Sequence, residues 1–516
     1  MSSDTTRGAA PSPPAAPHHG KPLGRPAWAV LALLLLALGV FLHSPVLRYG
    51  FLGNDSYPII AAARIGSLVD LAGTFTEELM DGRFPYGHFY RPILNLSVAV
   101  DHRLYGLQPR GYHRTDILIL CANAILIALL CRTLPFRRPF WGAVAASLFL
   151  LTHPIQGEIT SAIPRRGDSL SLLFLLLAVI AAGRPGRNGR AAAIALFSFL
   201  GVAAKETGAI IPVLVFARAY FIPEGNRPLR AGAAGRRALP AFAALALYMI
   251  LRFAVLGGLG GREPVGPASF LAGVFGSFPK LAAHTLLSYP ALDSDIDVIP
   301  LATALFLGIV AATLLLHRRG PMAGTARFLA VWLACGWLIH GLAGATYRWY
   351  VLHLLAPMAL LVGLVLTERA GPREGRIPLL YGTGRALLAL VLLLLAGANI
   401  AHTPLLKNDA RKTASSGRAE RILGMLEDGV EGARAGEVLS GEKILGLDEK
   451  AVRRGPGGVI LPFSIQAWAD LRFPDRTIRI VSPDEGEPIA AADEIVITIR
   501  EHPGLGSLLR RGGDGE

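Results

Sequence analysis

Apolar stretches long enough to cross a lipid bilayer recur along most of this chain. A crossing of about 30 Å of hydrocarbon needs roughly 20 apolar residues in a helix. Only 17% of the residues are charged, whereas soluble domains carry about 25%. The sequence therefore predicts an all-α polytopic membrane protein with about eleven transmembrane helices, at residues 28–45, 112–131, 139–153, 168–183, 189–204, 207–222, 237–256, 299–316, 327–344, 350–367 and 380–402.

The basic residues are unevenly distributed along the chain. The first 402 residues hold 35 Lys and Arg against 18 Asp and Glu, while the remainder holds 16 against 19. With the N-terminus inside, the short inner segments collect most of the 35 basic residues of this first part, as the positive-inside rule requires. The net charge of +14 is therefore a topology signal. It argues against a nucleic-acid partner and for a multi-pass membrane protein whose N-terminus lies in the cytoplasm.

The segments between the predicted spans differ strongly in length. Residues 1–26 are rich in Ser, Pro and Ala and predict a disordered cytoplasmic tail. Residues 27–402 form the predicted transmembrane domain, with large outer loops at 46–111 and 257–298. Both outer loops contain half-apolar stretches suited to helices that lie at the membrane interface. The inner connections are short and rich in Arg and Gly.

The composition changes after residue 402. We expect residues 403–516 to form a small α/β domain, which an odd number of spans places outside the cytoplasm, together with the C-terminus. Ala419–Val430 has the pattern of an amphipathic helix. Gly458–Phe463, Thr477–Val481 and Glu494–Ile499 have the pattern of short strands.

The three cysteines carry no recognisable chemistry. Cys121, Cys131 and Cys335 fall inside or at the ends of predicted spans. Their spacing provides neither a disulfide framework nor a metal site. We interpret them as small apolar side chains, and no metal-binding motif is predicted elsewhere.

Polar residues gather at the outer ends of the predicted spans. Asp55 comes just after the first span, at the start of a long outer loop. Charges near membrane depth are costly and usually face a cavity or a partner. Such an array on one side predicts a site open to the outer leaflet, with Arg91, Asp101, His113, His153, Glu158, Arg165, Arg166, Asp168, Lys205, Glu206 and Arg348 as candidate substrate-binding residues.

These residue types suit group transfer from a lipid phosphate. The departing phosphate needs cations, and the incoming hydroxyl needs a carboxylate that accepts its proton. Asp55 is the candidate base. Glu158 could hold the acceptor, orient a cation or coordinate a divalent metal. Guanidinium groups bind phosphate in a bidentate manner, and the candidate phosphate partners are Arg165, Arg166, Lys205 and Arg348.

Each candidate also has a simpler structural interpretation. Asp55 could cap a helix, and the two histidines could close helix ends. The remaining alternatives are a structural pair of Arg91 with Asp101, headgroup anchoring by Arg165 and Arg166, a local pair of Lys205 with Glu206, and an aromatic belt at Tyr347–Tyr350.

The order of these segments resembles the GT-C superfamily of polytopic glycosyltransferases. The similarity covers roughly residues 28–370 and is strongest to the transmembrane and tetratricopeptide-containing O-mannosyltransferases and their bacterial relatives. It rests on Asn54-Asp55, on Tyr90-Arg-Pro-Ile93 through Gly111-Tyr-His113, on Thr152-His-Pro-Ile-Gln-Gly-Glu158 with Arg166-Gly-Asp168, on Ala204-Lys-Glu206 and on Tyr347-Arg-Trp-Tyr350.

The resemblance implies a polyprenyl-phosphate-linked sugar donor, inversion at the anomeric carbon and an Asp of the first outer loop as the base. That role falls on Asp55. Relatives often have an acidic pair at this point, and here Asn54 takes the first position. The acid of the His-Pro segment falls on Glu158. The Arg of a late Arg-Tyr motif falls on Arg348, although Trp349 separates it from the tyrosine. The tetratricopeptide repeats are absent.

Three functions agree with this pattern. The first is a glycosyltransferase that moves a sugar, mannose by analogy, to a hydroxyl of a protein, glycan or lipid. The second is a flippase or exporter of a lipid-linked sugar, and the third is a polymerase or ligase of surface glycans. A transporter places polar residues midway through its spans and on both faces. Here the polar residues lie on one side, which favours the enzyme.

Overall fold

A computed structural model provides the structure of this protein. It describes residues 24–53, 55–83, 87–184, 189–222, 229–261, 267–287, 298–317, 322–341, 347–367, 378–406, 410–444, 462–481 and 489–499. Residues 1–23 of the predicted disordered tail lie outside the described residues. Arg25 begins the first helix with Pro26 in its first turn, where a missing N–H costs no hydrogen bond, so the helix starts earlier than the sequence predicts.

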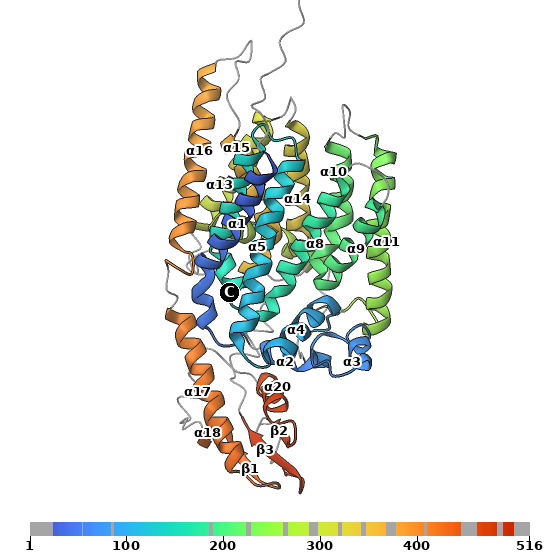
Figure 1. The fold of residues 1–516 in the computed structure, drawn as a ribbon, viewed down its shortest axis with the longest axis vertical. Coiled ribbons are helices and arrows are strands. Elements are labelled where there is room, and N and C mark those ends of the chain that lie inside the picture. Colours follow the sequence, from blue (N-terminus) through green and yellow to red (C-terminus); the bar gives the residue numbers. More distant parts are fainter. Residues whose placement is uncertain are drawn as a thin grey trace, which may run out of the picture.

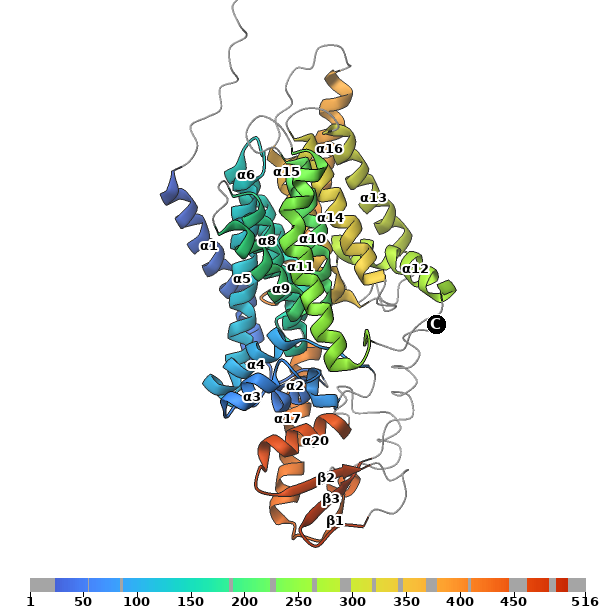
Figure 2. The same ribbon diagram turned by 90° about the vertical axis from the view of Figure 1, so that its right-hand side faces the viewer.

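A bundle of roughly parallel helices forms the body of the molecule (Figures 1 and 2). Each predicted span coincides with a helix of the described chain. These helices are α1 (Arg25–His43), α5 (Pro109–Thr133), α6 (Pro139–Thr152), α8 (Arg166–Ala182), α9 (Arg190–Ala204), α10 (Ile211–Phe221), α11 (Ala231–Leu256), α13 (Val298–Leu316), α14 (Ala323–Gly341), α15 (Leu352–Thr367) and α16 (Pro378–Ala401).

Six helical segments of the described residues are long and apolar enough to cross a membrane. They include α1, α5, α11, α13 and α14, and the sixth, Arg348–Thr367, contains α15. Three shorter apolar helices, among them α6 and α9, lie beside them in the same bundle (Figure 2). The protein is therefore a multi-pass membrane protein.

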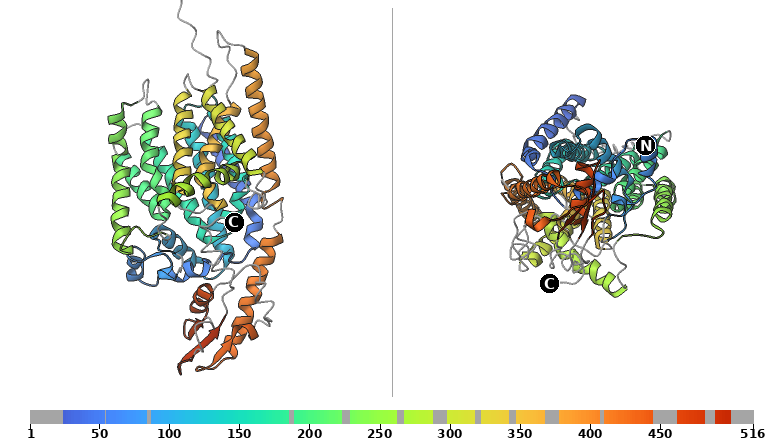
Figure 3. Two further views of the ribbon diagram at one scale, coloured as in Figure 1. Left: turned by 180° about the vertical axis from the view of Figure 1, so that it is seen from behind. Right: turned by 90° about the horizontal axis from the view of Figure 1, so that it is seen from below.

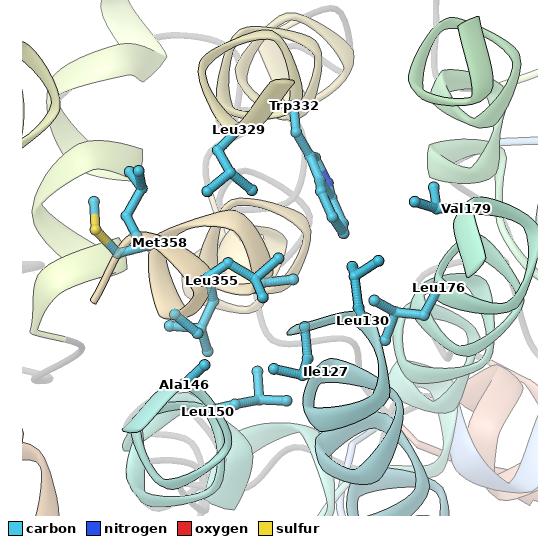
Figure 4. Packing of buried hydrophobic residues seen from close by; sticks show 14 of the residues in the cluster. Ile127, Leu130, Ala146, Leu150, Leu176, Val179, Leu329, Trp332, Leu355 and Met358 are labelled. Atoms are coloured by element: carbon cyan, nitrogen blue, oxygen red, sulfur yellow. The ribbon is translucent and has the colours of Figure 1, made fainter. Parts of the chain in front are cut away.

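Close packing between helices holds the bundle together. Trp332 of α14 is fully buried among leucines of the neighbouring helices (Figure 4). Between α6 and α15, a Cβ atom at Gly363 would come within 2.5 Å of the carbonyl oxygen of Gly142. Membrane helices gain stability mainly from such close contact, because lipid is as apolar as the side chains it touches. Small residues at this crossing therefore set the distance between the two helices.

Short helices of the first outer loop cover one end of the bundle (Figure 1). Apolar residues anchor them, including Ile59, Ile60 and Leu94, which are fully buried in one cluster with Tyr112. The predicted interfacial stretches are thus helical. The elements are η1 (Ser44–Arg48), α2 (Ser56–Ala62), α3 (Leu68–Gly73), η2 (Leu79–Gly82) and α4 (Pro92–Tyr105).

The second outer loop contains one long helix, α12 (Pro267–Leu286). It provides the helix expected for the half-apolar stretch of this loop and packs against α13 and α14. Four short elements complete the connections, namely α7 (Ile155–Ile159), η3 (Ile163–Arg165), η4 (Glu206–Ile210) and η6 (Arg348–Val351).

The C-terminal segment lies below the end of the bundle that the first outer loop covers (Figures 2 and 3). Three parallel strands form a sheet in the order β1-β3-β2, with Val438 opposite Val496 and Ile478 opposite Ile495. Leu426 and Trp468 pack onto this sheet. The elements are α17 (Ala410–Gly432), β1 (Val438–Ser440), α18 (Gly441–Ile444), α20 (Pro462–Arg472), β2 (Thr477–Val481) and β3 (Glu494–Thr498).

One strand prediction in this segment is wrong. Pro462 and Phe463 begin helix α20 and do not end a strand. Proline suits this place, because the first turn of a helix leaves its N–H groups without intrahelical partners. The other residues predicted for that strand, 458–461, lie outside the described residues.

Candidate active site

Asp55 occupies the turn that leads into α2. It is half-buried, and its backbone carbonyl accepts a hydrogen bond from the N–H of Ile59 at 3.1 Å. Gly53 precedes it with a φ of +89°, a conformation that favours glycine. The side chain of Asp55 makes no capping hydrogen bond to α2, so the helix-cap interpretation is wrong. Asn54 lies outside the described residues.

Glu158 binds three cations, one seven residues away and two from distant parts of the chain. Its Oε2 lies 2.8 Å from Nη1 of Arg165. Its Oε1 lies 3.4 Å from Nζ of Lys412 and 3.9 Å from Nη2 of Arg348. All four side chains are about one-fifth exposed. We call these four residues the Glu158 cluster. It brings together α7, η3, η6 and α17.

The charge state of Glu158 follows from these neighbours. Burial alone would raise the pKa of this carboxyl group, but Lys412, Arg165 and Arg348 together lower it to about 2. Glu158 is therefore an anion at any physiological pH. It holds cations in place and is not suited to exchange a proton during a reaction.

Aromatic rings connect the Glu158 cluster to a second group of charges. The guanidinium of Arg165 lies 3.8 Å from the ring centre of Trp349, and the ring of Trp349 stacks on that of Tyr347. The ammonium of Lys205 lies 5.0 Å from the ring centre of Tyr350. Cations above aromatic faces are held by the negative face of the ring. The segment Tyr347–Tyr350 is therefore more than a membrane-surface belt, because it orients two of the candidate cations.

Lys205 pairs with Asp168 and not with its neighbour Glu206. Its Nζ lies 2.6 Å from Oδ2 of Asp168, and both side chains are buried. Glu206 instead pairs with Arg91 at 2.9 Å and with Arg252 at 2.9 Å. The local pair of Lys205 with Glu206 is therefore a wrong interpretation. We call these five residues the Lys205 cluster.

Arg166 forms a separate network inside the protein. Its Nε donates to Asp116 at 2.5 Å, and its Nη2 lies 2.6 Å from Asp101. Its other contacts are with the hydroxyl and carbonyl of Ser97 and with the carbonyl of Tyr112. These contacts involve all three guanidinium nitrogens.

Arg166 is fully buried within this network, and its N–H groups already have protein partners. The structure therefore does not support the predicted substrate-binding roles of Arg166 and Asp101. It also excludes the alternative pair of Arg91 with Asp101.

The two candidate histidines bind backbone groups. His113 places Nδ1 at 3.0 Å from the carbonyl of Thr160 and Nε2 at 3.3 Å from that of Gly50. His153 follows the end of α6, and its Nδ1 accepts a hydrogen bond from the N–H of Ile155. Both are fully buried. The geometry favours the interpretation that they fix helix ends.

Three charged residues of these networks are absent from the sequence-based candidates. Asp116 and Arg252 lie inside predicted spans, and a charge at such a position is itself a signal of function or pairing. Lys412 lies in the C-terminal segment, 255 residues from its partner Gly157, and carries no such signal.

Among the described residues, no group of three or more His, Cys, Asp or Glu side chains could hold a metal ion. The carboxylate of Glu158, which the sequence leaves open as a metal ligand, is instead shared by the cations of its cluster.

Comparisons with known proteins support the resemblance found in the sequence. No family model matches the chain. The protein O-mannosyl-transferase Tmtc1 of Drosophila melanogaster is 29% identical over 180 residues, or 33% of this chain and 20% of the relative. The protein O-mannosyl-transferase tmtc2 of Xenopus laevis is 37% identical over 91 residues, or 18% and 11%. The chain thus spans between about a tenth and a fifth of the length of these curated relatives.

The fold extends the similarity to most of the chain. The crystal structure of ArnT from Cupriavidus metallidurans, bound to undecaprenyl phosphate, matches with a TM-score of 0.50 at 13% identity. The match covers 86% of this chain and 85% of that one. The chain therefore shares the fold of this ArnT structure over most of its length. The resemblance of the sequence to the O-mannosyl-transferases, and through them to the GT-C glycosyltransferases, is confirmed.

Proposed function

We propose that this protein transfers a sugar from a polyprenyl-phosphate donor to an acceptor hydroxyl, at the end of the bundle that the first outer loop covers. The observation that carries the proposal is the contact of α2 with η3. Asp55 stands at the start of α2, and η3 ends at Arg165 of the Glu158 cluster. This contact brings the helix that follows Asp55 against the turn that ends in a cation of the Glu158 cluster, which supports a site for transfer from a phosphate ester.

Asp55 acts as the general base in this reaction. Its carboxylate accepts the proton of the acceptor hydroxyl while the hydroxyl oxygen attacks the anomeric carbon of the sugar. The bond from that carbon to the phosphate oxygen breaks, and the polyprenyl phosphate leaves with the bonding electrons. Attack opposite to the leaving group inverts the configuration.

Cations stabilise the departing phosphate. Nη1 of Arg165 donates a hydrogen bond to the carboxylate of Glu158, and the guanidinium of Arg165 lies over the ring of Trp349. Arg348 approaches the same carboxylate from η6. Charges fixed before the reaction stabilise developing negative charge without reorganisation. Arg165 and Arg348 are therefore the proposed phosphate ligands, and Lys205 is a third candidate because Tyr350 links the two clusters.

The comparisons support the identity of the substrates at a coarser level. The ArnT structure holds undecaprenyl phosphate, which favours a polyprenyl phosphate as the leaving group. The names of the sequence relatives favour mannose as the sugar and a protein hydroxyl as the acceptor. We further propose that the protein lies in a bacterial cytoplasmic membrane, with the N-terminus in the cytoplasm and the site on the opposite face.

The test is a transfer assay with the purified full-length protein, a radiolabelled polyprenyl-phosphate mannose and a detergent extract of acceptors. We expect labelled acceptor with the wild type and a loss of at least about a hundredfold with Asp55→Asn. Asp70→Asn is the control, because Asp70 is an acid of the same loop that only caps α3. Transfer by Asp55→Asn at the wild-type rate would exclude Asp55 as the base.

A further inference from the structure

Helix α17 is attached to the candidate active site at two points. The Nζ atom of Lys412 donates to the carbonyl of Gly157 at 2.9 Å and to the hydroxyl of Ser161 at 3.3 Å, in addition to its ion pair with Glu158. One turn further on, the hydroxyl of Ser416 accepts a hydrogen bond from the N–H of Gly50 at 2.5 Å. The C-terminal segment therefore contacts both the Glu158 cluster and the chain that leads to Asp55.

Helix α20 contacts the helix that follows Asp55 (Figure 2). Leu471 of α20 is buried in one apolar cluster with Ile59 and Ile60 of α2. Beside it, Nη1 of Arg64 donates to the carbonyl of Asp470 at 3.3 Å. The C-terminal segment therefore covers α2 from the side opposite the bundle.

Helix α2 needs this cover because it is short. It has only seven residues, and isolated helices shorter than about 12 residues are unstable in water. Its conformation must come from its neighbours, and α20 is a principal one. The position of the Asp55 carboxylate depends in turn on the turn that starts α2.

We propose that the C-terminal segment is a positioning element of the active site. Lys412 fixes the carboxylate of Glu158, and α20 fixes the helix that follows Asp55. The proposal rests on the proposed function for its catalytic consequence, but the structural dependence of α2 on α20 can be measured without it. Lys412 and Leu471 are positioning residues, since neither is placed on the substrate.

The first experiment removes the ammonium of Lys412 in the full-length protein. We expect Lys412→Met to raise the KM for the polyprenyl-phosphate sugar about tenfold or more, because misplaced groups can cost up to a hundredfold. Lys412→Arg should restore most of the loss, since it keeps the charge. Arg421→Met is the matched control, because Arg421 is exposed on the same helix. Equal KM values for Lys412→Met and Arg421→Met would overturn the role of Lys412.

The second experiment separates α20 from α2. Leu471→Glu places a charge in the buried cluster, whereas Ile489→Glu changes a side chain that is 86% exposed in the same segment. We expect faster hydrogen exchange of the amides of α2 in Leu471→Glu alone, together with lower transfer. Unchanged protection of α2 in Leu471→Glu would overturn the proposal.

The two proposals fail in different ways. If the wild type transfers no sugar, the proposed function fails, and hydrogen exchange in Leu471→Glu still decides whether the C-terminal segment holds α2. If the wild type transfers sugar while Lys412→Met and Leu471→Glu match it in KM, rate and exchange, only the positioning role fails.

Discussion

Arg91 and Glu206 lie 115 residues apart in the chain, and their side chains form an ion pair of 2.9 Å. The pair ties the first outer loop to the short turn between α9 and α10. Arg252 of α11 binds the same carboxylate. One glutamate thus holds together three parts of the fold near the proposed site.

Glu206→Gln should destabilise the protein. The variant leaves the guanidinium groups of Arg91 and Arg252 without their anion, and breaking a partly buried pair costs roughly 2 kcal/mol or more. Thermal unfolding in detergent measures the effect as a lower Tm. Glu77→Gln is the control, because Glu77 is exposed in the same loop. Equal Tm values for the two variants would contradict this prediction.

Arg166→Lys should be almost as damaging as loss of the side chain. A lysine keeps the charge but has three N–H donors, and it cannot reproduce the planar contacts of the guanidinium with Asp101, Asp116 and Ser97. The cost of unpaired buried groups is roughly 3 kcal/mol. The measurement is the yield of folded protein by size-exclusion chromatography together with its Tm. A lysine variant as stable as the wild type would show that the network needs only a charge.

Gly363→Ala should weaken the packing of α6 against α15. The new Cβ would meet the carbonyl oxygen of Gly142 at 2.5 Å, and overpacking of this kind costs about 1–3 kcal/mol. Gly397→Ala in α16 is the matched control, because its Cβ meets nothing within 4 Å and alanine favours the helix. We expect a lower Tm for the first variant and an unchanged or higher Tm for the second.

Glu158 should stabilise the protein at neutral pH and lose this effect in acid. The cations of its cluster lower its folded-state pKa from 4.5 to about 2. The folded state therefore favours the ionised form, and the stabilisation is complete above about pH 4.5 and declines as the pH falls toward 2. The Tm difference between wild type and Glu158→Gln should be constant from pH 8 to pH 5 and shrink below pH 4.5. A difference that grows in acid would contradict the assignment.

The side of the membrane on which the site lies can be tested with single cysteines. Leu68 in the first outer loop is 83% exposed, and Ile489 in the C-terminal segment is 86% exposed. The native Cys121 and Cys131 are buried and should contribute little background, whereas Cys335 is partly exposed, so the unsubstituted protein is labelled as the blank. We expect Leu68→Cys and Ile489→Cys to react with an impermeant thiol reagent in intact cells. Labelling of either one only after lysis would show that its segment faces the cytoplasm.

The sequence located the helices well because hydrophobic length is a local property. Each predicted span coincides with a helix, and the strands at Thr477–Val481 and Glu494–Thr498 follow local alternation. It was less accurate where neighbouring residues decide the conformation, as at Pro462, which begins a helix and does not end a strand.

The pairing of charges needed the tertiary structure. The sequence placed Asp55, Glu158, Arg165 and Lys205 near one end of the bundle, because they follow or precede predicted spans on the same side. It did not indicate that Arg166 forms ion pairs with Asp101 and Asp116, or that Lys412 forms an ion pair with Glu158. Ion pairs form between side chains that folding brings together, and spacing along the chain carries no record of them.

What the sequence determined by itself is the class of architecture, because a chain with this many apolar stretches must place them in membrane helices. Only the tertiary structure decided which polar residues are fully bound within the protein and which lie beside the proposed site. It separates Arg166, whose guanidinium nitrogens are all bound by the protein, from Arg165, which an anion and an aromatic ring hold beside the helix of Asp55. The physical reason is that the role of a charge depends on the groups around it, and those come from segments far apart in the sequence.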